Sequence, residues 1–332
     1  MIAVIADDMT GAAEIGGVGI RYGLRTEVRM EVPEGKPVQG ETAAGQTELL
    51  VIATDTRSMA RDEAVEEMRR VTRAVMALGP AWVYKKTDSV LRGHVADELL
   101  AQMEVMGIGK ALLAPANPGL GRTIKGGRYY INGVPIHETS FRDDPEYPVS
   151  SSEVRAMLGA PEEKIVVGEV ETADDLRALA ACVDEGTFPA GAAEFFAVML
   201  GRKEVVREPA REQVDEMRRP ILFVSGTAFR KVAGQDGGDI VRRLREEGKA
   251  TVAGWPRESI AEQVRQVLSE VKVRELVIEG GATAYAVLRA TGLTTFVPVE
   301  EMALGVVRMH AGDIYATIKP GSYTWPGKIL TI

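Results

Sequence analysis

The sequence predicts an α/β protein of two domains, each a mostly parallel sheet flanked by helices, with a cleft between them. Short β-branched runs alternate with amphipathic helical patterns in both halves of the chain, which is typical of strand–helix–strand units. Polar or glycine-bearing clusters follow most of the apolar runs, at the position where ligands bind in an open parallel sheet. The length of 332 residues is long for one domain and suits two.

The first half begins with a buried strand at 2–6. Apolar residues at three- and four-residue spacing predict an amphipathic helix over 62–78. Strands are expected at 81–85 and 111–116, with a helix between them that Val95, Leu99, Met103 and Met106 mark. The pattern then changes.

Further along, Asn132-Gly133 between apolar runs indicates a β-hairpin. Thr172, followed by acidic residues, indicates the start of a helix.

A charge-dense stretch at 202–219 separates the halves, and we expect domains at 1–203 and 218–332. In the second half, strands are predicted at 221–226, 275–281 and 315–323. A helix is expected over 259–271, with Ser259 and Glu262 as a capping box. Gly292 suits the C-terminal cap of a further helix, which follows Gly281.

Composition excludes several classes of function. The net charge of −8 and the pI of about 5.2 argue against broad binding to nucleic acid. No apolar run approaches a membrane span. The lone Cys182 fits a reducing compartment, so we expect a cytoplasmic protein without disulfides. The three histidines lie far apart in sequence, so no protein-borne metal site is expected.

Four polar clusters in the first half each follow a predicted strand. If those strands are neighbours, one rim of the sheet collects carboxylates and cations that suit a small, anionic, polyhydroxylated ligand. The candidate residues are Asp7, Asp8, Asp55, Arg57, Lys85 or Lys86, Asp88, Arg92 and Arg122.

Each cluster also has a structural interpretation. Asp7 and Asp8 could start a turn and cap the following helix. Asp55 and Arg57 could form a surface ion pair. Lys85 and Lys86 alternate along a strand, so only one of them is expected to face the rim.

Small residues follow the strands of the second half, at 224–228, 279–284 and 319–322. Such turns let backbone N–H groups approach an anion, as nucleotide phosphates require. The glycines at 16–19 do not form a dinucleotide fingerprint, because they lie inside the first predicted helix. Close packing of that helix on a sheet explains them better, and a dehydrogenase is therefore disfavoured.

Taken together, these motifs resemble the four-carbon acid sugar kinases along nearly the whole chain. The resemblance is carried by "ADDMTGAAE", "TDTRS", "KKTDSVLRG", "APANPGLGRTIKGGRYYINGVPIHETSFRDDPEYPV", "GGATAYAVL" and "IKPGS". It implies an N-terminal domain that binds an acid sugar and a C-terminal domain that binds ATP. It also implies phosphorylation of a hydroxyl of a sugar acid such as threonate, erythronate or a 2-oxo relative.

The resemblance also implies roles for individual residues. The acid sugar would meet Asp8, Arg57, Lys86, Asp88 and Arg92. We expect Asp8 to accept the proton of the hydroxyl, with Asp88 next and Asp7 as a structural helper. Mg²⁺ would bridge the ATP phosphates and keep most of its own waters. The nucleotide would meet Ser225, Gly280, Gly281, Ala282, Thr283 and Gly321.

Some loops depart from the family pattern. Glu194 stands in a turn where a glycine–serine–alanine–glycine–leucine run is expected, and "KPGSYTWP" replaces the usual ending. These differences leave a second hypothesis open, namely a catalytically inactive protein that binds a sugar acid and a nucleotide. Whether the chain forms a homo-oligomer is also left open.

Overall fold

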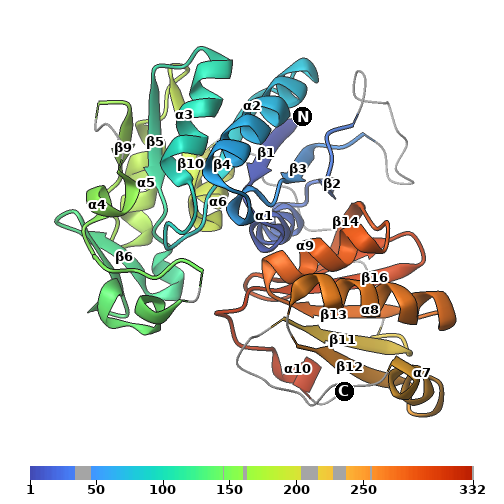
Figure 1. The fold of residues 1–332 in the computed structure, drawn as a ribbon. Coiled ribbons are helices and arrows are strands. Elements are labelled where there is room, and N and C mark those ends of the chain that lie inside the picture. Colours follow the sequence, from blue (N-terminus) through green and yellow to red (C-terminus); the bar gives the residue numbers. More distant parts are fainter. Residues whose placement is uncertain are drawn as a thin grey trace. The chain divides into compact units, whose positions relative to one another are not determined.

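The computed structural model describes residues 1–33, 46–144, 146–159, 163–202, 216–226, 237–254 and 256–330 (Figure 1). The chain forms two compact units that are not contiguous in sequence. The first comprises Met1–Asp7, Val32–Gly40 and Thr54–Arg207, and the second comprises Asp8–Glu31, Glu41–Ala53 and Glu208–Ile332. The functional division at 1–203 and 218–332 stays a prediction, and most of the stretch expected to connect the domains lies outside the described residues.

The first unit is built on a parallel sheet, as predicted. Its strands run in the order β1 (Ile2–Ala6), β4 (Trp82–Lys86), β10 (Thr187–Gly191), β5 (Lys110–Ala114) and β9 (Ile165–Val167). The helices of this unit are α2 (Arg61–Ala77), α3 (Val95–Met106), α4 (Val154–Leu158), α5 (Ala173–Ala181) and α6 (Ala193–Arg202).

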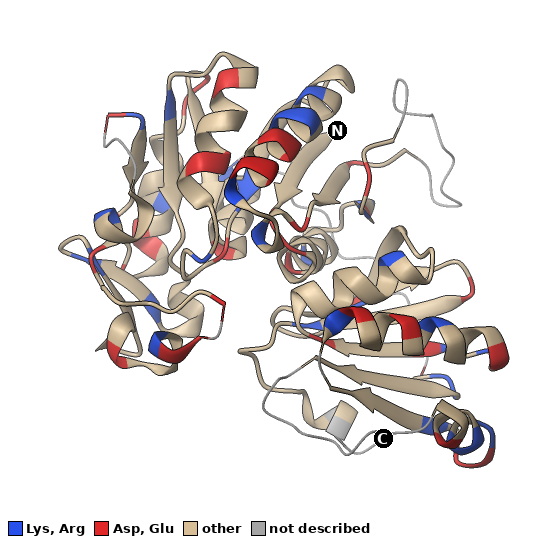
Figure 2. Ribbon diagram, viewed as in Figure 1, with Lys and Arg blue, Asp and Glu red and all other residues tan. Residues whose placement is uncertain are grey.

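Alternation along β4 shows that helices cover both faces of this sheet. The Tyr84 ring packs against Phe195 and Phe196 of α6, with centroids 6.3 and 5.1 Å away. The next residue, Lys85, points to the opposite face, where it meets Met68 of α2 and Glu98 of α3. Charged residues gather on the helices, α2 and α8 (Arg257–Glu270) among them (Figure 2). The prediction of a sheet flanked by helices is therefore confirmed.

The predicted hairpin is present in the first unit. Strands β6 (Arg122–Lys125), β7 (Arg128–Ile131) and β8 (Val134–Pro135) form a small antiparallel sheet. Asn132 and Gly133 connect β7 to β8 with φ angles of 50° and 78°, the left-handed pair that a tight hairpin turn requires. Short 3₁₀ helices lie at Thr56–Ser58, Pro118–Leu120, Ile136–Glu138 and Ser140–Asp143.

The second unit has a mixed sheet. Parallel strands β12 (Lys249–Ala253), β11 (Ile221–Ser225), β13 (Glu275–Glu279) and β16 (Ile314–Lys319) are followed by antiparallel β15 (Val306–Ala311) and β14 (Thr295–Ala303). Strands β2 (Thr26–Arg29) and β3 (Leu49–Ala53) complete it. The helices are α1 (Met9–Arg21), α7 (Gly237–Glu246), α8, α9 (Gly281–Ala290) and α10 (Gly327–Leu330).

Close packing explains the glycines of α1. A Cβ atom on Gly16 would lie 2.8 Å from Cγ of Pro298, and one on Gly19 would lie 2.1 Å from Oγ1 of Thr26. The helix therefore lies directly against β14 and β2, which agrees with the packing interpretation of these glycines.

The predicted capping box at Ser259 and Glu262 is wrong. Helix α8 begins two residues earlier, at Arg257, with Pro256 as its N-cap and no side-chain hydrogen bond at that cap. Proline at this place fixes φ for the turn into the helix, so the helix starts there. Glu262 instead pairs with Arg265 on the helix surface. Elsewhere Thr172 caps α5 through a capping box with Asp175, and Gly292 has a φ of 73° just after α9, as predicted.

No helix in the described ranges combines the length and the apolar character that crossing a membrane requires.

Replacing Gly191 by alanine should destabilise the first unit by about 3 kcal/mol, because overpacking against a rigid neighbour is costly. Gly191 has a φ of 151°, and its Cβ would lie 2.1 Å from the backbone oxygen of Ala114 on β5. Gly79→Ala is the matched control, because Gly79 also has a positive φ of 67° but nothing within 4 Å of the added atom. Urea unfolding measures both variants, and equal losses of stability would contradict the clash.

Candidate functional site

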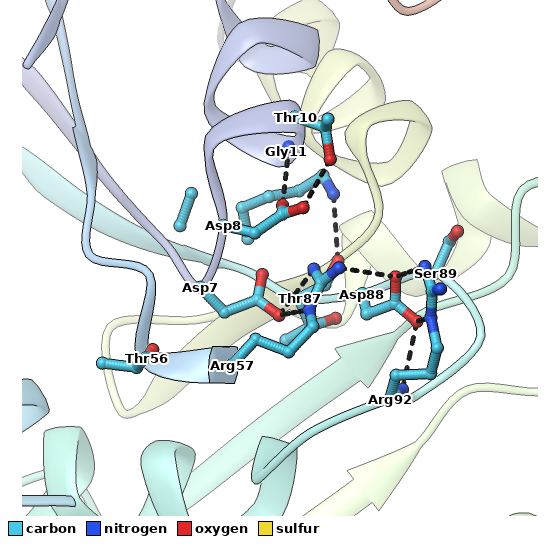
Figure 3. A network of polar contacts seen from close by, with 12 residues as sticks. Asp7, Asp8, Thr10, Gly11, Thr56, Arg57, Thr87, Asp88, Ser89 and Arg92 are labelled. Carbon is cyan, nitrogen blue, oxygen red and sulfur yellow. Dashed lines mark hydrogen bonds and ion pairs between the residues drawn. The ribbon is translucent and has the colours of Figure 1, made fainter. Parts of the chain in front are cut away.

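A buried ion-pair network lies at the carboxyl ends of β1 and β4 in the first unit (Figure 3). Arg57, from the 3₁₀ helix Thr56–Ser58, donates from Nε to Oδ2 of Asp7 at 2.9 Å, and its Nη2 lies 2.8 Å from the same oxygen. Its Nη1 lies 3.4 Å from Oδ1 of Asp88. The Arg57 side chain is only 12% exposed, so the surface-pair interpretation does not apply to it. Arg57 links two strand ends.

Asp88 is the centre of this network. It accepts hydrogen bonds from Nε and Nη2 of Arg92, both at 2.9 Å, and from the backbone N–H of Arg92 at 3.0 Å. Leu91 adopts a φ of 64° in the turn that brings Arg92 back to Asp88. Burial opposes ionisation of the carboxyl, but the charges of Arg92 and Arg57 outweigh it, so the pKa of Asp88 lies far below its usual value. A carboxylate held so firmly in its ionised form is a poor proton acceptor.

A segment that the strand-end pattern did not identify braces the arginines. Nη1 of Arg92 lies 3.2 Å from Oδ2 of Asp144, and the Phe141 ring centroid lies 5.7 Å from the Arg92 guanidinium. The Tyr147 hydroxyl donates to the backbone oxygen of Arg57. Sequence reasoning missed all three roles because these residues do not follow a strand. The only signal was the dense run of aromatic and acidic residues in "SFRDDPEYPV".

Arg122 joins the same region through Ser89. It is 8% exposed at the start of β6 and donates to the Ser89 hydroxyl, while the Tyr129 hydroxyl donates to the Ser89 backbone oxygen. Phe141 lies under Arg122 as well, with 6.0 Å between guanidinium and ring centroid. Asp55 has a more local contact, because its Oδ1 accepts from the Ser58 hydroxyl at 3.2 Å.

The two lysines of β4 separate as expected. Lys85 is fully buried on the α2–α3 face, with its Nζ 2.5 Å from Oε2 of Glu98. Lys86 is 3% exposed and turns toward the strand end, where its Nζ donates to the backbone oxygen of Thr87 at 3.0 Å. Lys86 is therefore the lysine that lies at the strand end.

Glu194, the residue that departs from the family pattern, ties down a neighbouring loop. Its Oε2 accepts from the backbone N–H of Gly119 at 3.1 Å. The contact joins the start of α6 to the loop after β5, so the glutamate has a local structural role.

In the second unit, Asp8 is the N-cap of α1. Its Oδ1 accepts from the backbone N–H of Gly11 at 2.7 Å, and its Oδ2 accepts from the Thr10 hydroxyl (Figure 3). The same carboxylate also lies at the start of α9, because a Cβ on Gly281 would be 2.3 Å from Oδ2 of Asp8. Asp8 thus caps one helix, as its structural interpretation held, and faces the positive end of another.

The predicted nucleotide residues gather at the ends of β11, β13 and β16. Ser225, Glu279 and Lys319 are in register on these adjacent strands. Gly280 follows with a φ of 95°, and a Cβ on Gly226 would lie 1.9 Å from Oγ1 of Thr283. The remaining candidates, Ala282 and Gly321, lie in the first turn of α9 and in the loop after β16. Thr227 lies outside the described residues.

Among the described residues, no group of three or more histidine, cysteine or acidic side chains could hold a metal ion. At the start of α9, side chains already lie close to Gly281: a Cβ there would be 2.3 Å from Oδ2 of Asp8 and 3.1 Å from Oγ1 of Thr10.

Comparisons with known proteins point to one family. The model of the sugar-binding N-terminal domain matches residues 2–186. A D-threonate kinase of Salmonella typhimurium is 37% identical over 168 residues, which are 50% of this chain and 38% of that protein. A D-erythronate kinase of Heliobacterium modesticaldum is 29% identical over 184 residues, or 55% of this chain and 41% of that protein. The matched part thus spans about two-fifths of these curated relatives.

The fold is shared more widely. A crystal structure of a Haemophilus influenzae protein, from a family of unknown function, has a TM-score of 0.72 at 19% identity and covers 97% of both chains.

Proposed function

Because the chain belongs to the family of the sugar-binding N-terminal domain, we propose that it is an ATP-dependent kinase that phosphorylates a hydroxyl of a four-carbon sugar acid. The observation that carries the proposal is the match of residues 2–186 with the sugar-binding domain, together with the similarity of 50–55% of the chain to proteins named D-threonate kinase and D-erythronate kinase. That segment contains the whole arginine–carboxylate network. Threonate, erythronate and their oxo relatives are the first candidate substrates.

The network of the first unit supports binding of an acid sugar. Arg57 and Arg92 use their guanidinium nitrogens on Asp7, Asp88 and Asp144, so their positions are fixed before any ligand arrives. Lys86 and Arg122 lie at the same end of the sheet and add further positive charge. A rigid rim that carries both positively charged groups and hydrogen-bond acceptors suits a carboxylate and several hydroxyls.

The second unit supports binding of the nucleotide. The backbone N–H groups at the start of α9 would meet the phosphates of ATP. Mg²⁺ arrives with ATP as part of that substrate and neutralises charge on the phosphates. Asp8 lies at the same helix end, where it would accept the proton of the attacking hydroxyl. We place this reaction in the cytoplasm.

A second candidate function is a protein that binds a sugar acid and a nucleotide without transferring phosphate. The capping contacts of Asp8 favour it, because they give this carboxylate a structural reason to be present.

ADP release with MgATP, measured against a panel of four-carbon sugar acids and their oxo forms, tests the kinase. We expect turnover on at least one acid. Binding of MgATP without turnover on any acid would favour the second candidate. Absence of nucleotide binding would contradict the assignment of the second unit.

A further inference from the structure

Three polar side chains from adjacent strands form a row beneath the start of α9. Oε2 of Glu279 accepts from the Ser225 hydroxyl at 3.1 Å, and Oε1 of Glu279 lies 2.9 Å from Nζ of Lys319. Glu279 directly precedes Gly280 and the first residue of α9. Glu279 and Lys319 were not among the residues predicted to bind the nucleotide.

The hydrogen-bond donors of Lys319 contact other groups of the protein. Besides Glu279, its Nζ donates to the backbone oxygens of Pro320 at 2.8 Å and Tyr323 at 2.6 Å. A lysine ammonium has three donors, and these contacts use all of them. The side chain is 1% exposed, and the Trp325 ring centroid lies 5.2 Å from Nζ. Lys319 therefore does not reach out to a ligand.

Glu279 places a negative charge near the proposed phosphate site. Its side chain is 21% exposed and carries a negative charge beside the helix end that the proposed function gives to the phosphates. Like charges repel, and the repulsion is stronger where water is partly excluded. Lys319 cancels that charge, and the carboxylate in turn orients the Ser225 hydroxyl.

We propose that Glu279 and Lys319 form a charge-compensated positioning pair for the nucleotide. Lys319 acts by neutralising Glu279 and by holding the loop after β16, without touching the phosphates. This inference rests on the proposed function, because it assumes that the phosphates lie at the start of α9. Beyond that function, we expect loss of Lys319 to weaken binding more strongly for ligands that carry more negative charge.

Calorimetric titration of ADP and of adenosine, without sugar acid, tests the pair. For Lys319→Met we expect the Kd for ADP to rise about tenfold, which corresponds to roughly 1.4 kcal/mol. The Kd for adenosine should stay within about twofold, because adenosine carries no charge. The double variant Lys319→Met/Glu279→Gln removes both charges and should recover most of the ADP affinity. Lys272→Met is the control, since Lys272 forms an exposed pair with Asp313 in the same unit.

Equal losses of affinity for ADP and adenosine in Lys319→Met would overturn the inference, because they would show that Lys319 has only a structural role. Failure of the double variant to recover ADP affinity would do the same. If Lys319→Met does not fold, Glu279→Gln provides the second arm. This variant should bind ADP with unchanged or higher affinity. A loss of affinity for ADP but not for adenosine would contradict the proposed role of the pair. An unmodified chain that binds neither ligand would overturn the proposed function together with this inference.

Discussion

Replacement of Asp8 by asparagine should lower the rate of phosphoryl transfer about a thousandfold, within the range that loss of a general base produces. The stability of the protein should change by no more than about 1 kcal/mol, because asparagine caps a helix as well as aspartate does. The amide oxygen can still accept from the Gly11 N–H, which Asp8 now does at 2.7 Å. The substitution therefore separates the chemical role of Asp8 from its capping role.

Steady-state kinetics on the acid found by the substrate panel, together with urea unfolding, gives both quantities. Asp175→Asn is the matched control, because Asp175 accepts backbone hydrogen bonds at the start of α5, from Thr172 at 2.8 Å and Glu171 at 3.0 Å. It should leave the rate unchanged. Full activity in Asp8→Asn would show that Asp8 is only a cap.

Replacement of Asp88 by asparagine should destabilise the first unit by about 3 kcal/mol. Removing one partner of a buried ion pair leaves the other charge without compensation. Here Arg92 and Arg57 would both lose their shared carboxylate. Asp62→Asn is the control, since its side chain is 97% exposed and pairs with Arg61 at 3.6 Å, so it should change stability by less than about 0.5 kcal/mol. Equal effects of the two substitutions would contradict the central place of Asp88.

The same residue predicts a dependence of stability on pH. The pKa of Asp88 is lowered on folding, because the charges of Arg92 and Arg57 outweigh the effect of burial. The contribution of Asp88 to the free energy of unfolding is thus fully present above the unfolded pKa of about 4. It is lost as the pH falls toward the folded pKa. As the pH falls below about 4, the free energy of unfolding should decrease more steeply in the unmodified chain than in Asp88→Asn. If the free energy of unfolding changed with pH equally in both proteins, the arginines would not stabilise the ionised form of Asp88.

Local structure could be predicted from the sequence where a single pattern of residues determines it. Three- and four-residue spacing located α2 and α3, and Asn132-Gly133 located the hairpin. The strand-end rule also brought together Asp7, Arg57 and Asp88, because parallel strands end at one edge. In these cases the deciding contacts lie within one element or at one edge of a sheet.

The rest depended on contacts that no local pattern reveals. Strands β14 and β15 were not predicted, and their hairpin makes the sheet of the second unit mixed. Helix α1 and strand β2 belong to that unit because glycines of α1 pack against β14, far along the chain, and β2 pairs with the same strand. The pairing of Glu279 with Lys319 needs the register of two strands that are separated in sequence by α9, β14 and β15.

The most direct test of the kinase assignment is phosphorus NMR of a mixture of the unmodified chain, MgATP and a four-carbon sugar acid. We expect a new phosphate monoester signal that grows together with ADP and requires both the acid and the protein. Threonate and erythronate are the first acids to test, followed by their oxo forms. Release of inorganic phosphate alone, or no change in ATP with every acid although ATP binds, would contradict phosphoryl transfer to a sugar acid.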